Sequence, residues 1–110
     1  MTVKLIVLKS GEDIIADVQE MVVGDENEQK VVGYFFDKPC VVKLFGHNPE
    51  EDRESPFRVQ MMPWIPLSDD EKIPVAADWV ITIVEPIEKV KELYLKKVSK
   101  EKEEENDVGD

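Results

Sequence analysis

The segment from Leu8 to Val18, LKSGEDIIADV, constrains the fold more than any other part of the chain. It joins an apolar run that begins at Val3 to a second run through the turn-forming pair Ser10-Gly11. In the second run every other residue is apolar and shares one face, the period-two pattern of a half-buried strand. These residues are Ile14, Ala16 and Val18. The segment therefore predicts two antiparallel strands, over 3–8 and from 12 to about 23.

Three further strands are predicted downstream. The stretch KVVGYFFDKPCVVKLF, from Lys30, is rich in β-branched and aromatic residues and is expected to bend near Asp37 to Pro39, because proline cannot donate to a ladder. After a charged surface loop over 46–56, a fourth strand is expected from Phe57, ending in proline-rich sequence before Leu67. An acidic turn over 68–72 then precedes a fifth strand over 79–85, which is expected to be buried on both faces.

A helix is predicted from Pro86, because proline suits the first turn of a helix, where its missing N–H costs nothing. Apolar residues then recur at three- and four-residue spacing to form one stripe: Ile87, Val90, Leu93, Tyr94 and Val98. We expect residues 1–98 to form one domain and the acidic residues 99–110 to form a frayed tail. The helix either covers the barrel or docks a partner, and truncation at Glu85 would separate these alternatives.

Composition limits the function. The 110 residues carry 25 acidic and 14 basic side chains and a net charge of -11, so an anionic ligand would need a local basic patch. No apolar run approaches the roughly 20 residues needed to cross a membrane, and no export signal is recognised. The single cysteine, Cys40, cannot form an internal disulfide, which favours a cytoplasmic protein, and we expect no membrane partner.

Residues capable of catalysis or metal binding are present but do not form a motif. His47 has acidic neighbours in its loop but no second histidine or cysteine to complete a metal set. Cys40 follows Pro39 in a strand and is interpreted as a small buried residue rather than a nucleophile. The glycines stand singly, so no phosphate-binding loop is formed. We therefore predict no enzymatic activity, no catalytic residue, no metal and no cofactor.

The order of these segments resembles the Sm-like (LSm) family. Its first half-motif, apolar-x-x-Gly-x-x-apolar-x-Gly-x-apolar, is matched by Leu8, Gly11, Ile14 and Val18, with Ala16 in place of the second glycine. The second half is matched in DKPCVVKL by its aspartate and its closing apolar pair, while Cys40-Val41 replaces the family's Met-Asn. Ile73-Pro74-Val75 stands where the family has Ile-Arg-Gly. The chain is most similar to small Sm-like proteins of marine metagenomes that are thought to come from cyanophages.

The resemblance implies a mainly β fold, a small five-stranded antiparallel Sm-like (SH3-like) barrel, here with a C-terminal α-helix. It also implies a homo-oligomeric ring of roughly five to seven subunits. Such a ring would bind RNA or single-stranded nucleic acid, in a non-enzymatic accessory role in RNA or DNA processing. The alternative is a protein-interaction or scaffold ring that uses its acidic surface, which the net charge and the two replaced motifs favour. Salt-sensitive RNA binding would distinguish them.

Two sets of candidate residues follow. Aromatic and basic side chains could stack on bases and contact phosphates around a ring pore, although the two aromatic ones could equally belong to the core. This nucleic-acid set is Tyr34, Phe36, Lys38, Lys43, Arg53 and Arg58. The second set consists of residues expected to make contacts between subunits. They lie in two apolar strands that could each form an edge of the sheet. This interface set is Phe57, Val59, Met61, Trp79, Ile81 and Ile83. Residues 61–65 are either part of that edge or a separate partner-binding patch.

Overall fold

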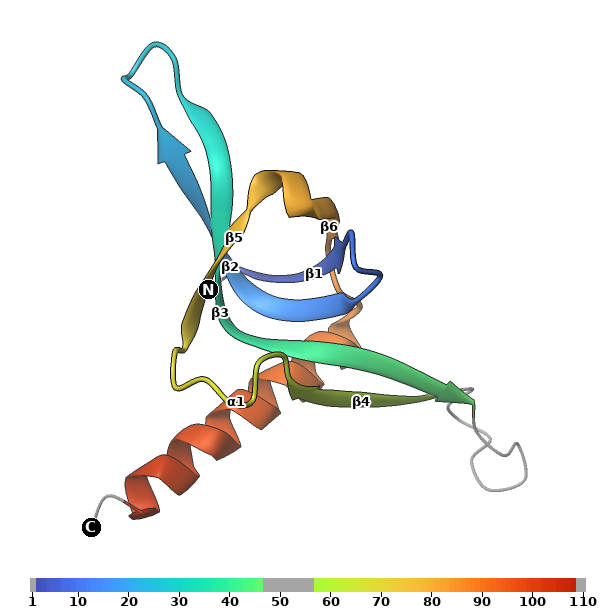
Figure 1. The fold of residues 1–110 in the computed structure, drawn as a ribbon. Helices are drawn as coiled ribbons and strands as arrows, with labels where there is room; N and C mark the ends of the chain where they lie inside the picture. The colour runs from blue at the N-terminus through green and yellow to red at the C-terminus, as the bar shows by residue number, and fades with distance from the viewer. Residues whose placement is uncertain (1, 47–56, 109–110) are drawn as a thin grey trace.

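The computed structural model describes residues 2–46 and 57–108 and contains one antiparallel sheet, one short 3-10 helix and one long α-helix (Figure 1). The strands run along the path β4-β3-β2-β1-β6, and β5 pairs with β3 beside this path. Their bounds are β1 Val3–Leu8, β2 Asp13–Val23, β3 Lys30–Gly46, β4 Phe57–Pro63, β5 Lys72–Ala76 and β6 Val80–Val84. The helices are η1, Ala77–Trp79, and α1, Glu88–Val108.

The β1–β2 hairpin forms where the segment 8–18 predicts it. Val3 pairs with Asp17 and Val7 with Asp13, so the turn lies between Val7 and Asp13. Gly11 supplies the turn, because its φ of +89° lies in the left-handed region that other residues avoid, and its amide donates to the Leu8 carbonyl at 2.9 Å. This part of the sequence prediction is confirmed.

The predicted bend in β3 is present as a β-bulge. Ile15 pairs with Cys40 but Asp17 pairs with Asp37, so Lys38 and Pro39 together oppose a single residue of β2. Lys38 has a φ of +51°, and its amide donates to the Glu71 carbonyl at 2.7 Å instead of to the β2 ladder. The bulge divides β3 into one half that pairs with β5 and another that pairs with β4.

The core has two parts, one on each face of the curved sheet. The inner part lies inside the barrel and consists of Ile6, Leu8, Ile14, Ala16, Phe36 and Val75. The outer part lies between the sheet and α1 and consists of Val3, Ile15, Cys40, Val90, Tyr94 and Val98. The apolar stripe predicted for the helix therefore packs against the barrel, through three of its five residues.

Tyr94 fixes the helix to the bulge. Its side chain is 1% exposed, and its hydroxyl donates to the carbonyl oxygens of Asp37, at 3.0 Å, and Lys38, at 3.1 Å. These carbonyls lie where the bulge interrupts the β2–β3 ladder, so the helix supplies a donor that the sheet lacks there.

The expectation of a closed five-stranded barrel is wrong in two respects. The sheet has six strands, because residues 72–76 form β5, although only the last residue of the predicted turn, Lys72, and no strand was expected there. Pro74 is tolerated there because β5 pairs on one side only, with β3. The barrel is also not closed, since β4 and β6 end the strand path without pairing with each other.

The C-terminal elements differ from expectation as well. The strand predicted over 79–85 begins one residue later, and Trp79 belongs to η1 instead. It is not buried on both faces: Ile81 is 63% exposed and Val84 46%, because β6 is an edge strand. The helix begins at Glu88, two residues after Pro86, and continues to Val108, beyond the Val98 at which the apolar stripe ends.

The first prediction concerns Tyr94→Phe. Loss of the hydroxyl removes a donor from the carbonyls of Asp37 and Lys38, of which the Lys38 carbonyl keeps its weak hydrogen bond from Cys40 Sγ at 3.8 Å. It should lower the free energy of unfolding at pH 7 by about 1 kcal/mol. Burial raises the pKa of Tyr94 above its ordinary value of 10.0, so the folded state retains the proton after the unfolded chain has lost it. The stability that Tyr94 contributes is thus complete below pH 10 and falls above it, by at most about 1.4 kcal/mol per pH unit.

Urea unfolding of both proteins between pH 7 and 11 measures the effect. The difference between them should shrink above pH 10, because the variant lacks this titrating group. A difference that stays constant across this range would contradict the proposed linkage.

Candidate nucleic-acid interface

The two aromatic residues of the predicted nucleic-acid set lie in or against the inner core. Phe36 is 0% exposed, and its ring lies 6.1 Å from that of Trp64, at an interplanar angle of 47°. Tyr34 is half-buried and packs against the same cluster. In this conformation the Phe36 ring has no exposed surface on which a base could stack. For this residue the structure agrees with the alternative in the sequence analysis that it belongs to the core.

The basic members of the set are separated along β3 and β4. Lys38 is half-buried at the bulge, whereas Lys43 and Arg58 are exposed in the β3–β4 pair. Arg53 lies outside the described residues, as do His47 and most of the predicted surface loop. Of the basic members whose positions the structure describes, Lys43 and Arg58 are the two that lie close together, in the β3–β4 register.

These two cations flank an aromatic ring that the sequence prediction missed. Lys43 pairs with Gln60 and Phe45 with Arg58, so the four side chains alternate in register on one face of the β3–β4 pair. All four are exposed, and Phe45 is 45% exposed. An exposed ring between a lysine and an arginine is an arrangement that stacks on a base and contacts phosphates. We call Lys43, Phe45, Arg58 and Gln60 the β3–β4 patch.

One sequence signal could have identified Phe45. It stands at the end of its apolar run, next to Gly46 and the charged loop, where a strand leaves the core. The cluster Tyr34, Phe35 and Phe36 drew attention to the middle of the strand, where aromatic residues more often pack than bind.

Five residues of the predicted interface set lie on the two edge strands and Trp79 lies in η1, just before β6, so the set does not form one surface. Val59 and Met61 are half-buried against the outer core, and Ile83 against the inner core. Trp79 and Ile81 are exposed, and the side chain of Phe57 lies outside the described part of the chain. The exposed members are thus on the β6 side.

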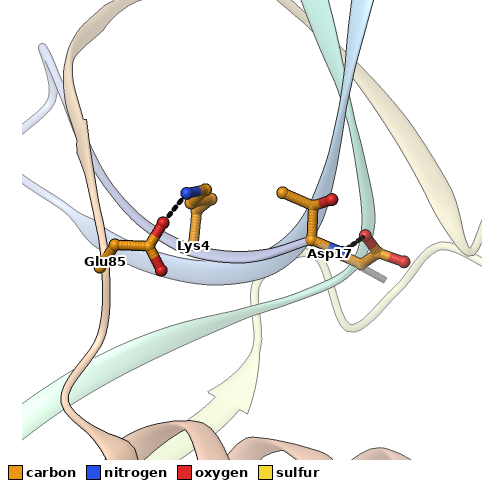
Figure 2. Close-up of polar contacts among 4 residues, drawn as sticks. Lys4, Asp17 and Glu85 are labelled. Carbon is orange, nitrogen blue, oxygen red and sulfur yellow. Dashed lines mark hydrogen bonds and ion pairs between the residues drawn. The ribbon is translucent and has the colours of Figure 1, made fainter.

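A groove lies between the two edge strands and the start of α1. It encloses about 1060 Å³ and is lined mainly by aliphatic side chains from β1, β3, β4, β6 and α1. The most exposed of these are Leu44, Val84, Ile87 and Leu93. Glu85, at its border, forms an ion pair with Lys4 of β1 (Figure 2).

A second, smaller pocket of about 210 Å³ lies near the start of the chain. It contains Asp17 and Asp37, which face each other across the β2–β3 pair. The Thr2 amide donates to Asp17 Oδ1 at 2.8 Å (Figure 2). Asp37 Oδ1 is buried and has no hydrogen-bond partner among the described residues. Among the described residues no group of three or more histidine, cysteine or acidic side chains could hold a metal ion.

Comparison with known proteins identifies the family. A family model described as the Sm_like domain matches residues 3–95, from β1 into α1. This match covers most of the chain, which therefore belongs to the Sm-like family. Proteins of this family in general form rings, bind RNA and are not enzymes. A comparison with curated proteins gives no match. Within the described residues, no helix has the length and apolar character needed to span a membrane.

The second prediction separates the core aromatic residue from the exposed one. Phe36→Ala should lower the free energy of unfolding by about 3 to 5 kcal/mol, because it leaves a cavity beside Trp64. Phe45→Ala should change it by only about 0.5 kcal/mol, because much of that ring is already in solvent. Urea unfolding of the two variants tests this. Equal losses of stability would show that Phe45 also belongs to the core and would remove it from the β3–β4 patch.

Proposed function

We propose that the protein is a non-enzymatic, nucleic-acid-binding ring of identical subunits with an accessory role in RNA or DNA processing. The observation that carries the nucleic-acid part is the β3–β4 patch, in which Phe45 lies between Lys43 and Arg58. The patch gives a strongly acidic chain the local basic surface that an anionic ligand requires.

Ring formation is supported by the ends of the strand path. Within residues 2–46 and 57–108, β4 and β6 each have one side that no other strand pairs with, and unpaired strand edges present N–H and C=O groups to another chain. In the proposed ring, β4 of one subunit pairs with β6 of the next. Head-to-tail contacts of this kind form a closed ring when a whole number of the rotations between neighbouring subunits makes a full turn. We propose a ring of roughly five to seven subunits.

Repetition around a ring strengthens a weak patch. One aromatic ring and two cations make few contacts with a nucleic acid, but several copies on a common axis bind one strand together. Of the predicted six-residue set, the proposal takes Lys43 and Arg58 as its centre. The half-buried Lys38 and Tyr34 are secondary contacts, and Arg53, which lies outside the described residues, is kept as a further contact on the sequence alone.

The second candidate function is a scaffold ring that binds a protein through its acidic surface. Its specific support is the net charge of -11, together with the replacement of the family's Met-Asn and Ile-Arg-Gly residues.

The main proposal also includes a location, the cytoplasm. If the protein is encoded by a phage, this is the cytoplasm of the host. The single buried cysteine supports this, because the fold does not depend on a disulfide.

The third prediction tests nucleic-acid binding. The protein should bind single-stranded oligo-U or oligo-A RNA at low ionic strength, with an affinity that falls as salt increases. Phe45→Ala should weaken binding roughly 5- to 100-fold through loss of stacking. Lys43→Glu should both weaken binding and flatten its salt dependence. Fluorescence anisotropy measures each affinity.

Lys9→Glu is the matched control, because it makes the same charge change at an exposed lysine outside the patch. It should bind more tightly than Lys43→Glu. Equal losses in the two variants would show that only overall charge matters, and absence of salt-sensitive binding by the unmodified protein would favour the scaffold function.

The fourth prediction tests the ring. The unmodified protein should be an oligomer by light scattering at micromolar concentration. Ile81→Lys should dissociate it, because lysine on an edge strand opposes pairing with another strand and Ile81 is 63% exposed. Leu67→Lys is the control, since Leu67 is 100% exposed and lies outside both edge strands. A monomeric unmodified protein would exclude the ring.

A further inference from the structure

The ends of β2 and β3 project from the barrel as a two-stranded hairpin, residues 20–32, which we call the arm (Figure 1). The register between β1 and β2 extends only as far as Asp17, and β5 pairs with β3 only from Gly33 onward. In the part of the chain that the structure describes, no third strand pairs with the arm. Each of its two strands therefore has an open edge.

The open edge of β2 presents a regular row of backbone groups. The Val18 amide donates to the Thr2 carbonyl at 2.9 Å, so Val18 directs its backbone groups toward β1. Because this direction alternates along a strand, Glu20 and Val22 direct their N–H and C=O groups the same way, beyond the start of β1. Both residues are exposed. The edge therefore offers two backbone donors and two acceptors to a further strand.

The other edge of the arm has features that oppose pairing. On β3 the register leaves one residue, Val32, without a partner on β2, and the same strand end carries Lys30. A β-bulge and a lysine are means by which natural sheets discourage pairing at an edge. Residues 19–23 of β2 contain neither proline nor lysine, and the register places no extra residue among them. The β2 edge is thus the one that suits a further strand.

The tip of the arm holds this edge in shape. Gly24 has a φ of +107°, and a Cβ there would overlap the Glu28 carbonyl oxygen. Asp25 Oδ1 accepts hydrogen bonds from the amides of Asn27 and Glu28, both at 3.0 Å. A preformed edge lowers the entropy that a binding strand must overcome.

The charges of the arm indicate which kind of strand would bind. The arm carries four carboxylates and one lysine: Glu20, Asp25, Glu26, Glu28 and Lys30. A second copy of this chain would bring like charges together, and its net charge of -11 would add to the repulsion. The occupant that fits is therefore a basic segment of a different protein.

The smaller pocket, of about 210 Å³, lies beside Gln19, where this edge begins. Its volume is below the roughly 300 Å³ of pockets that hold whole small molecules, so it suits a single side chain. Asp17 and Asp37 line it with one lysine, Lys72, which leaves one negative charge in excess. A residue paired with Met21 would project on the same face of the sheet as this pocket. The pocket is thus a nearby site for a long basic side chain of an added strand.

We propose that residues 19–23 of β2 bind an extended basic segment of another protein by strand addition. Hydrogen bonds to the backbones of Glu20 and Val22 supply affinity, and the carboxylates beside the edge select basic side chains. The inference rests on neither nucleic-acid binding nor the ring, because it uses neither the β3–β4 patch nor the edges of β4 and β6. It gives the scaffold function a defined binding site.

The first test changes only the ligand. The probe is a fluorescent hexapeptide, Lys-Val-Arg-Val-Lys-Val, and anisotropy measures its affinity, which should fall as salt increases. The same peptide with methylated backbone nitrogens keeps its side-chain charges but cannot donate from its backbone, and should bind at least roughly fivefold more weakly. Equal affinities of the two peptides would overturn strand addition.

The second test changes the edge. Val22→Pro removes a donor from the open edge but not from the ladder, because the Val22 N–H points away from β3. It should weaken binding of the unmethylated peptide at least roughly fivefold. Val22→Thr is the matched control, since it keeps both the N–H and the β-branched shape and should leave the affinity unchanged. Circular dichroism checks that both variants fold, and an unchanged affinity of folded Val22→Pro would contradict the proposal.

The third test changes the charge. Glu20→Lys should weaken peptide binding and reduce its salt dependence. Glu92→Lys makes the same change at an exposed residue of α1, outside the arm, and should have the smaller effect. Equal losses in the two variants would show that overall charge, and not this edge, attracts the peptide.

The outcome is distinguishable from that of the proposed function. Val22→Pro should leave RNA affinity unchanged, because the β3–β4 patch does not include the arm. If the hexapeptide does not bind and Val22→Pro instead lowers the size of the oligomer in light scattering, the edge joins copies of this chain and the proposal is overturned.

Discussion

The hydrogen bonds from Tyr94 to the bulge of β3 are the contact on which the arrangement depends. β3 changes partners at Lys38-Pro39, and the Tyr94 hydroxyl donates to two carbonyls there, on the face of the sheet that the helix covers. The same side chain lies at the centre of the outer core, between β1, β2 and the helix. One residue thus satisfies the backbone where the sheet bends and holds the element that covers the sheet's outer face.

Local patterns predicted the elements that depend on local physics. The β1–β2 hairpin follows from a glycine turn between apolar runs, and the helix follows from a three- and four-residue apolar spacing. β5 was missed because its sequence, KIPVA, has no such pattern and becomes a strand only by pairing with residues 33–37. The open barrel was not predictable either, because closure depends on the distance between two edges that are remote in sequence.

The candidate site was predicted less well, and the bulge explains why. Before it, Tyr34 and Phe36 point to the inner core; after it, Val41 does, so the alternation of the strand is shifted by one residue. If the inward and outward alternation is assumed to be unbroken along the whole strand, the residues on one side of the bulge are assigned to the wrong face of the sheet. The more exposed phenylalanine of β3 is Phe45, at 45% against 36% for Phe35, and it lies beyond the core near the end of the strand.

The position of Tyr94 also has a consequence for biosynthesis. The outer faces of β1 and β2 stay uncovered until the helix that follows all six strands has been made. A nascent chain that ends before Tyr94 leaves Val3 and Ile15 without the helix residues that cover them, and its bulge lacks the Tyr94 hydroxyl. The outer core therefore forms only after residues 88–98 have been made, that is, after all six strands.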